Sequence, residues 1–235
     1  VILFVKSMHT FKAAQTAQKL LGEGGYVVTL QNGMGNVEHI AEVVAPPKII
    51  AGTTSNGATI LGPGKVRHAG KGPTTMGFWY DGDSIEIEKI ADLFTGAGIE
   101  TTVAGSIKEV VWDKLLVNVG INAITALTGI KNGQLLDLQV TKALSRAAVE
   151  EAVALARATG IGVRENVVDH VFDIAGMTAG NRSSMGQDVD HYRRTEIDAI
   201  NGFVVRESKK MGLDVPVNKT LTALIETVQE HYTED

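Results

Sequence analysis

The sequence predicts an α/β region followed by an all-helical region, with a boundary near Gly105. Before this boundary, short apolar runs rich in β-branched residues alternate with helical patterns, which is typical of helices layered on a largely parallel sheet. After it, long helical patterns joined at glycines take over. The length of 235 residues suits two small domains. We therefore divide the chain into residues 1–105 and 106–235.

The first region begins with a continuous apolar run from Val1 to Val5, which is typical of a strand that is buried on both faces. A helical pattern over 10–21 and a strand pattern over 26–31 come next, so the segment predicts a β-α-β unit. Because the chain starts without Met inside the first strand, we expect the natural protein to extend further upstream.

The remaining elements follow the same logic, with glycines marking most of the joints between them. In the first region we expect helices over 37–45 and 85–95, strands over 49–54 and 100–103, and hairpin-like strands between Gly57 and Gly77. In the second region we expect helices over 107–128, 140–159, 164–176, 187–211 and 217–231.

Composition excludes several classes of function. The formal net charge of -5 disfavours a nucleic-acid partner, because such proteins carry a basic surplus that neutralises phosphates. The chain has no cysteine, so disulfides and thiolate chemistry are excluded, and its histidines lack the spacing of metal ligands. Apolar runs such as Leu115 to Val119 are far shorter than the roughly 20 residues that span a bilayer. We therefore expect a cytoplasmic protein that binds no membrane, metal or nucleic acid.

The helix expected over 107–128 carries Lys114, Asn118 and Asn122 at intervals of four residues. Their side chains would form one stripe, each about 6 Å further along the helix axis, and Thr125 would extend it. The residues around the stripe are mostly apolar, and burying a polar group without a partner is costly. The stripe therefore indicates a wet cleft. The alternative is the solvent-facing side of an amphipathic helix.

Two polar residues stand out further along the chain. Ser184 is positioned to begin a helix, where its hydroxyl could do no more than cap backbone N–H groups. Glu196 falls on the helix expected over 187–211, with Ile197 and Ile200 nearby, which predicts a half-buried carboxylate. The alternative for Glu196 is a solvated carboxylate paired with Arg193 or Lys114, which contributes little stability.

The loop Asn32-Gly33-Met34-Gly35 follows the second strand. Ligands of open α/β sheets bind at the carboxyl ends of the strands, and glycines allow close approach of the backbone. Lys6 ends the preceding strand and adds a positive charge at the same edge. Taken alone, the loop is equally explained as a tight turn and Lys6 as a surface lysine.

Together these motifs resemble the ketopantoate reductase (2-dehydropantoate 2-reductase) family, and they cover the chain from Lys6 to Pro216 in order. The residues that carry the resemblance are Asn32-Gly33-Met34-Gly35, Gly52-Thr53-Thr54, Gly64-Lys65-Val66, Trp112-Asp113-Lys114-Leu115 with Asn118 and Asn122, Asn132-Gly133, Ser183-Ser184-Met185, and the run from Thr195 to Gly202.

The resemblance implies a Rossmann-like dinucleotide-binding domain followed by a helical domain similar to the C-terminal domain of 6-phosphogluconate dehydrogenase. It implies NADPH-dependent reduction of 2-dehydropantoate to pantoate, a step of pantothenate and coenzyme A biosynthesis, with Lys114 as general acid and Glu196 ordering the site. Substrate contacts are implied for Asn32, Asn118, Asn122, Asn132 and Ser184, and cofactor contacts for Lys6, Asn32, Ala58 and Glu196.

The sequence departs from the family in one respect. A complete member should open with a strand, a glycine-rich turn and a helix that bind the pyrophosphate. No G-x-G-x-x-G follows a strand in this sequence. We therefore interpret the chain as an N-terminally truncated member, and leave open whether it binds NADPH poorly and is inactive in this form.

Two other interpretations stay open. In the first, the chain is a noncatalytic helical module that forms a homodimer through the apolar faces of helices 140–159 and 187–231. In the second, it is a related reductase that acts on a different 2-keto acid. The segment that contains Ser184 and Glu196 favours 2-dehydropantoate over other substrates.

Overall fold

The computed structural model describes residues 1–232. Contacts divide the chain into two compact units. The α/β unit contains Val1–Gln31 and Gly35–Val111, and the helical unit contains Asn32–Met34 and Trp112–Asp235. The predicted fold class, an α/β part followed by a helical part, is confirmed.

The α/β unit is built on a five-stranded sheet with the order β1-β2-β3-β6-β7. The strands are β1 (Ile2–Leu3), β2 (Val27–Thr29), β3 (Ile49–Thr54), β6 (Thr74–Phe78) and β7 (Thr101–Val103). The first three are parallel, β6 runs antiparallel to β3, and β7 is parallel to β6. The carboxyl ends of β1, β2 and β3 therefore share one edge of the sheet, and those of β6 and β7 lie at the opposite edge.

Alternate residues of a strand point to opposite faces of the sheet, and here the residues on both faces are buried. On one face Val28, Ile50 and Met76 pack against Ile87 and Ala91 of a helix. The residues between them on the strands, such as Val27 and Ile49, are equally buried. The helices of this unit are α1 (Thr10–Leu20), α2 (Asn36–Ala41) and α3 (Ser84–Gly96), with single 3-10 turns at Ser7–His9 and Pro46–Lys48.

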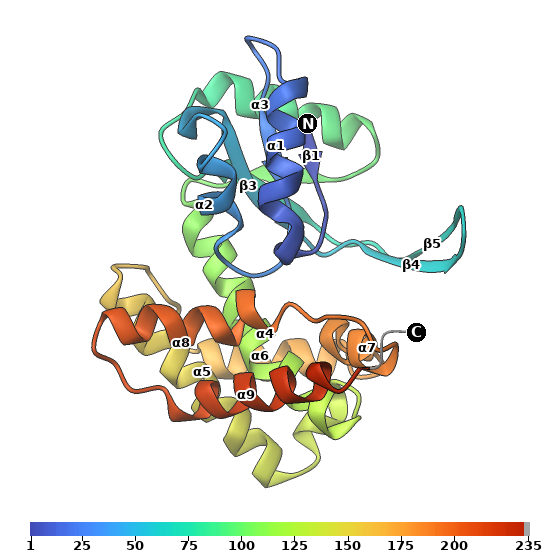
Figure 1. Ribbon diagram of the computed structural model, residues 1–235, viewed down its shortest axis with the longest axis vertical. Coiled ribbons are helices and arrows are strands. Elements are labelled where there is room, and N and C mark those ends of the chain that lie inside the picture. Colours follow the sequence, from blue (N-terminus) through green and yellow to red (C-terminus); the bar gives the residue numbers. More distant parts are fainter. Residues whose placement is uncertain (233–235) are drawn as a thin grey trace. The chain divides into compact units, whose positions relative to one another are not determined.

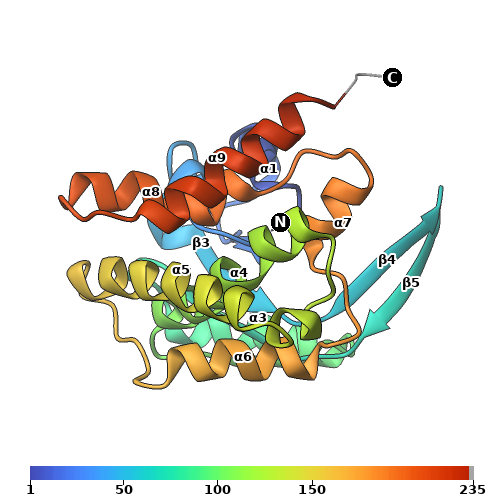
Figure 2. The same cartoon turned by 90° about the horizontal axis from the view of Figure 1, so that it is seen from below.

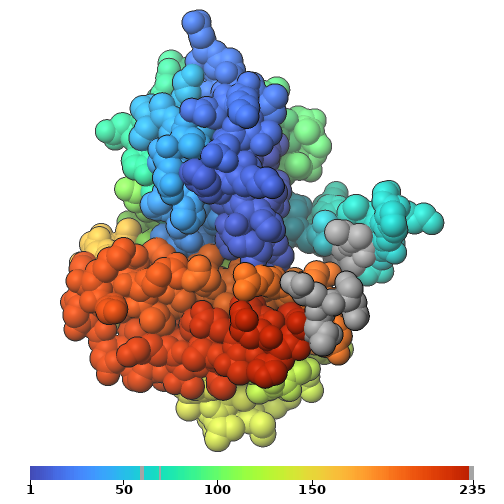
Figure 3. Space-filling model, viewed as in Figure 1, coloured from blue at the N-terminus to red at the C-terminus, as the bar shows by residue number. Residues whose placement is uncertain are grey.

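A separate antiparallel hairpin consists of β4 (Gly57–Gly62) and β5 (Lys65–Gly70). It stands away from the body of its own unit (Figures 1 and 3). The hairpin-like strands expected between Gly57 and Gly77 are therefore only partly found, because β6, at the end of this stretch, joins the main sheet. Pairing of β6 with β3 then places Gly52 where an added Cβ would lie 2.4 Å from the Thr75 carbonyl oxygen, so this position requires glycine.

The helical unit packs its helices around a long apolar one, α4 (Figure 2). Within the described residues its helices are α4 (Ile107–Thr128, its first turn in the α/β unit), α5 (Gln139–Ala158), α6 (Val167–Met177), α7 (Ser184–Asp190), α8 (Asn201–Lys210) and α9 (Pro216–Glu230), with 3-10 turns at Gly133–Leu136 and Ile197–Ala199. Gly120 lets α5 and α6 approach α4, because an added Cβ would lie 2.8 Å from both Val149 and Val171.

The apolar character of α4 reflects this central position. By length and composition this helix of 22 residues could cross a membrane, with a mean hydropathy of 1.4 over an 18-residue stretch. However, 61% of that stretch is buried inside the protein, as in the core helix of a folded domain. The packing of α4 therefore accounts for its hydropathy without a membrane.

The prediction of one continuous helix over 187–211 is wrong, because two helices and a 3-10 turn occupy this range. The chain leaves α7 at Tyr192, whose φ of 54° lies in the left-handed region. Arg193 then binds back to Asp188, through its backbone N–H and its guanidinium group. These local polar contacts compete with the hydrogen bonds of a continuous helix. The break was not predicted because the sequence has no glycine or proline between 187 and 200.

Candidate functional site

The polar stripe predicted from the four-residue spacing lies on α4, as expected. Asn122 is buried, with 5% of its surface exposed, while Lys114 and Asn118 are partly buried. Neighbouring side chains such as Leu115 and Val119 are fully buried. The stripe is therefore not an ordinary solvent-facing side of an amphipathic helix.

Lys114 has the most strongly perturbed charge in this region. Burial lowers the pKa of its amine to about 8, because a desolvated ammonium loses its hydration. The carboxylate of Glu196 acts in the opposite direction and raises the pKa. An amine near neutrality next to a carboxylate can hold a proton and also release it readily.

Glu196 is more deeply buried than predicted, with 7% of its surface exposed, and it does not lie on a helix. It precedes the 3-10 turn Ile197–Ala199, and its carbonyl accepts hydrogen bonds from the N–H groups of Ala199 and Ile200, both at 3.1 Å. The predicted alternative was a solvated carboxylate paired with Arg193 or Lys114, and the burial of Glu196 shows that it is not solvated. Arg193 pairs with the buried Asp188 at 3.2 Å, whereas the charge of Glu196 acts on Lys114.

The Asn32 loop belongs by its contacts to the helical unit, although it follows strand β2 in the sequence. The N–H of Met34 donates to the Ala199 carbonyl at 2.8 Å. Gly33 has a φ of +76°, and an added Cβ would lie 2.6 Å from the Ala199 Cβ. The structure thus joins the Asn32 loop to the turn that follows Glu196, which nothing in the local sequence patterns indicated.

The capping role considered for Ser184 belongs to the preceding residue, Ser183. Ser183 is the N-cap of α7: its buried hydroxyl accepts a hydrogen bond from the Gly186 N–H at 3.0 Å. Thr125 on α4 donates its hydroxyl hydrogen to the same oxygen at 2.7 Å. Ser184, the first residue of the helix, is exposed, so its hydroxyl is available for a ligand.

Asn132 lies in the turn after α4. Its amide nitrogen donates to the Thr178 hydroxyl at 3.0 Å, and its backbone N–H donates to the Asn181 carbonyl at 3.0 Å. Its buried side-chain oxygen Oδ1 has no hydrogen-bond partner within residues 1–232. A buried acceptor of this kind is costly unless a water or ligand satisfies it.

Two predicted cofactor contacts lie in the α/β unit. Lys6 is partly buried and follows β1 at its carboxyl end, where Gln31, after β2, donates to the Val5 carbonyl at 2.6 Å. Ala58 is exposed on β4, four residues after β3 ends. Lys6 thus lies at the ligand-binding edge expected of parallel strands, and Ala58 lies on the projecting hairpin.

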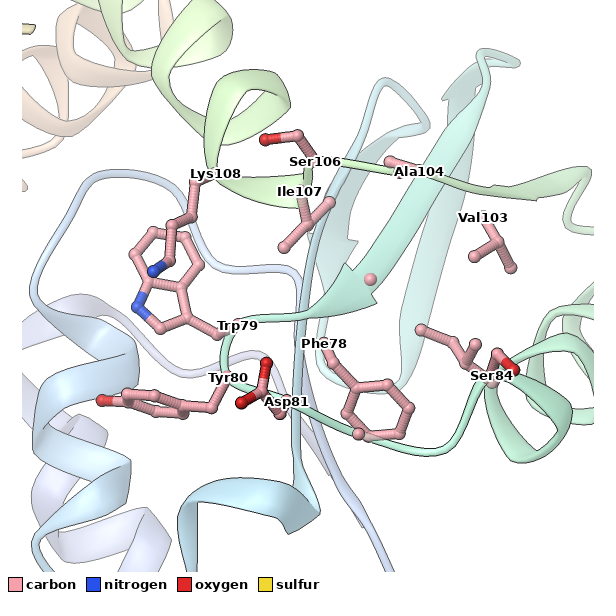
Figure 4. Close-up of a pocket in the computed structure, with 14 residues that line it drawn as sticks. Phe78, Trp79, Tyr80, Asp81, Ser84, Val103, Ala104, Ser106, Ile107 and Lys108 are labelled. Carbon is pink, nitrogen blue, oxygen red and sulfur yellow. The ribbon is translucent and has the colours of Figure 1, made fainter. Parts of the chain in front are cut away.

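A pocket of about 570 Å³ in the α/β unit was not predicted (Figure 4). It lies at the carboxyl ends of β6 and β7, which is the sheet edge opposite to Lys6. The Lys108 ammonium lies 5.7 Å from the centre of the Trp79 ring, an ordinary cation–π contact. Within residues 1–232, no group of three or more His, Asp or Glu side chains could hold a metal ion.

Comparison with known families identifies both parts of the chain. Residues 106–229 match the family described as "Ketopantoate reductase PanE/ApbA C terminal", and residues 1–81 match "Ketopantoate reductase PanE/ApbA". The chain belongs to the ketopantoate reductase family. This confirms the resemblance carried by the sequence motifs, and it makes the protein an oxidoreductase.

Among the relatives of this ketopantoate reductase is the 2-dehydropantoate 2-reductase of Halobacterium salinarum, which is 41% identical over 229 residues, 97% of this chain and 75% of the relative. A PanE/ApbA family ketopantoate reductase from Ralstonia eutropha superposes with a TM-score of 0.91 at 29% identity, covering 100% of this chain and 76% of the other. D-mandelate dehydrogenase in complex with NADH gives 0.93 at 28% identity, with coverage of 99% and 79%. The Rossmann-like architecture of the α/β unit is confirmed by these structures.

Proposed function

We propose that this protein reduces 2-dehydropantoate to pantoate with NADPH as hydride donor, a reaction of pantothenate and coenzyme A biosynthesis. The observation that carries the proposal is the partly buried Lys114 amine, whose pKa burial lowers to about 8 beside the carboxylate of Glu196. Family membership supports the same reaction class.

In this proposal Lys114 is the general acid. When bound, the nicotinamide supplies a hydride to the keto carbon, and the carbonyl π electrons move onto oxygen. That oxygen then takes a proton from the Lys114 ammonium, so the products are the hydroxy acid, the oxidised cofactor and a neutral amine. A pKa of about 8 leaves Lys114 mostly protonated at neutral pH and makes it a stronger acid than an ordinary lysine.

Glu196 has two proposed roles. Its charge favours the ammonium form of Lys114, which keeps the acid loaded before hydride transfer. We also propose that its carboxylate contacts the nicotinamide half of the cofactor. The turn that carries Glu196 is bonded to the Asn32 loop through Ala199 and Met34, which supports a shared part in ordering the site.

Neutral polar residues are proposed to hold the substrate. The amides of Asn118 and Asn122 can donate to a carboxylate and accept from a hydroxyl without adding charge next to Lys114. Ser184 offers an exposed hydroxyl at the start of α7. Asn132 contributes a buried oxygen that a substrate hydroxyl would satisfy.

The residues proposed to meet the cofactor fit a nicotinamide dinucleotide. Lys6 provides a positive charge for phosphate at the carboxyl end of β1, and Asn32 provides an amide after the carboxyl end of β2. The backbone near Ala58, four residues after β3, is the third proposed contact. A lysine at this position suits the pyrophosphate of NADH as well as that of NADPH, so the proposal of NADPH rests on the family resemblance.

Replacing Lys114 tests the proposal directly. We expect Lys114→Ala to lower kcat for NADPH-dependent reduction of 2-dehydropantoate by about 100-fold or more, the usual contribution of a general acid. The matched control is Lys108→Ala, which removes another lysine of α4 that lies over Trp79. Turnover by Lys114→Ala within a few-fold of the unmodified chain would contradict the acid role.

A second candidate is reduction of another 2-keto acid with NADH. It is favoured by the similarity to D-mandelate dehydrogenase, whose structure was determined in complex with NADH. Comparing kcat/KM for 2-dehydropantoate with that for an aryl-substituted 2-keto acid, each with NADPH and NADH, separates the two. A higher kcat/KM for the aryl substrate would replace our first proposal with this one.

We also propose that the helical unit forms a homodimer. A groove of about 430 Å³ on this unit is walled only by uncharged side chains. They are Ile124, Leu127, Thr128, Leu144, Pro216, Val217, Thr220, Leu221 and Leu224. If the chain were solely a noncatalytic association module, it would dimerise without binding NADPH, and calorimetry that detects micromolar NADPH binding to this chain would exclude that alternative.

A further inference from the structure

We propose that Arg182 is a positioning residue for 2-keto acid binding: it holds helix α7, and with it Ser184, against the C-terminal half of α4. The inference rests on the proposed function, because it takes Ser184 and Asn122 as substrate contacts. Arg182 directly precedes the Ser183-Ser184-Met185 motif, but no catalytic or binding role is proposed for it above.

The Arg182 guanidinium closes the end of α4. Its side chain is only 16% exposed. One terminal nitrogen donates to the carbonyl of Thr125, in the last turn of α4, and to that of Ile130 at 2.9 Å. Carbonyls at a helix C-terminus carry partial negative charge, so a cation is well suited to them. The Thr125 carbonyl also accepts a hydrogen bond from the Gly129 N–H at 3.1 Å, and Arg182 is its second donor.

The same guanidinium also binds the far end of α7. Its Nε and second terminal nitrogen form two parallel bonds to the Asp190 carboxylate, at 2.8 and 2.9 Å. This forked geometry fixes direction as well as distance, which a lysine cannot reproduce. Gly186 makes room for it, because an added Cβ would lie 2.5 Å from the guanidinium carbon.

The near end of α7 is held separately. Thr125 donates its hydroxyl hydrogen to Ser183, which in turn caps the helix at Gly186. The residue that follows, Ser184, therefore takes its position on α4 from two attachments, Thr125 at one end of α7 and Arg182 at the other. A helix of seven residues has little stability of its own, so it depends on such attachments.

The attachment on α4 lies next to a proposed substrate contact. The Thr125 hydroxyl also approaches the Asn122 carbonyl at 3.2 Å, and Asn122 lies three residues earlier on the same helix. Arg182 thus acts on the spacing between two groups proposed to grip one substrate. It should affect substrate binding and leave the proton transfer from Lys114 unchanged.

The test is a double-mutant cycle between Arg182→Lys and Ser184→Ala. We expect Arg182→Lys to raise KM for 2-dehydropantoate about tenfold, the change that corresponds to the loss of about one hydrogen bond. The kcat and the KM for NADPH should stay within about twofold of their values in the unmodified chain. In the Ser184→Ala background the same change should raise KM by less than about twofold, because the residue it positions is gone. Asp190→Asn, which weakens only the forked bond, should show a smaller effect of the same kind.

Arg157→Lys, at an exposed arginine near the end of α5, is the matched control and should leave KM unchanged. Circular dichroism of each variant separates a local effect from loss of folding. An equal rise of KM in both backgrounds, or a fall of kcat at constant KM, would overturn the positioning role while leaving the proposed reaction intact. If Ser184→Ala alone leaves KM unchanged, both the substrate role of Ser184 and this inference fail, whereas Lys114→Ala still tests the reaction.

Discussion

Lys114 is a partly buried lysine whose pKa differs from that of an ordinary lysine. Its pKa of about 8 in the folded chain lies well below the ordinary value for lysine, because desolvation outweighs the attraction of Glu196. Between pH 8 and the ordinary lysine range, the unfolded chain binds more protons at this group than the folded one. The burial of this lysine therefore lowers the free energy of unfolding most below pH 8, and this destabilisation is relieved as the pH rises through that window.

The first prediction concerns the pH dependence of activity. A general acid must be protonated, so kcat/KM for ketone reduction should fall about tenfold per pH unit above pH 8. Glu196→Gln removes the charge that raises the pKa of Lys114 and should move this fall to lower pH. Asp198→Asn changes an exposed carboxylate two residues away and serves as the control. A pH profile identical for Glu196→Gln and the unmodified chain would refute the coupling.

At this scale the sequence predicted the position of the polar stripe on α4 better than it predicted the surroundings of the other candidate residues. The stripe of Lys114, Asn118 and Asn122 follows from helical spacing alone and lies on α4 as expected. Glu196 was expected on a helix and instead precedes a 3-10 turn. Ser184 begins α7 as expected, but the hydroxyl that caps this helix belongs to Ser183. Ser183 is held by a hydrogen bond from Thr125, a distant partner that a local pattern does not reveal.

Among the elements, α4 determines how closely the helical unit can pack. Its Gly120 faces α5 and α6, where an added Cβ would come within 2.8 Å of Val149 and Val171 and 3.1 Å of the Ser145 hydroxyl. Since core side chains are packed as densely as in crystals, there is little room to relax around a new methyl group.

The second prediction follows from this contact. Gly120→Ala should lower the free energy of unfolding by about 1–3 kcal/mol, measured by denaturant unfolding followed through helical circular dichroism. Gly176→Ala, near the end of α6, is the matched control because its added Cβ would meet only Leu136, at an ordinary 3.8 Å. There alanine should be neutral or stabilising, as it is a better helix former than glycine. Equal effects at the two sites would contradict the packing argument.

Most elements were predicted from periodicity and glycine punctuation, including the full extent of α4 over 107–128. The break between α7 and α8 was not, because the polar contacts of Asp188 and Arg193 replace the glycine or proline that usually marks a helix end. The hairpin β4–β5 and strand β6 were expected as one set of hairpin-like strands. Their division between two sheets depends on the pairing of β6 with β3 and β7, which is a long-range property.

For the whole molecule, association is the property that the apolar groove predicts. On α9 and α5, its exposed rim includes Leu224 and Leu144. Lys142 and Arg146 of α5 lie over the Phe172 ring of α6, outside this groove. An uncharged face on a helical unit is better buried against an identical face than left in water.

The predicted domain limits, residues 1–105 and 106–235, stay a prediction.

The third prediction tests this face. The chain should elute as a dimer in size-exclusion chromatography with light scattering, and Leu224→Glu should yield monomers because a buried carboxylate without a partner is costly. Leu93→Glu, at a leucine of α3 that is 72% exposed, is the control and should leave the dimer unchanged. A monomer at all accessible concentrations would exclude the homodimer proposal.

The close contact between Gly33 and Ala199 restricts how this chain can be recombined with its homologues. The two positions are far apart in sequence, yet there is no space between them for one additional carbon atom. A chimera with a crossover point anywhere between them would combine residue 33 of one parent with residue 199 of another. Only parents that have small residues at both positions could be exchanged freely, so a library of such hybrids should lose soluble members wherever this pair is mismatched.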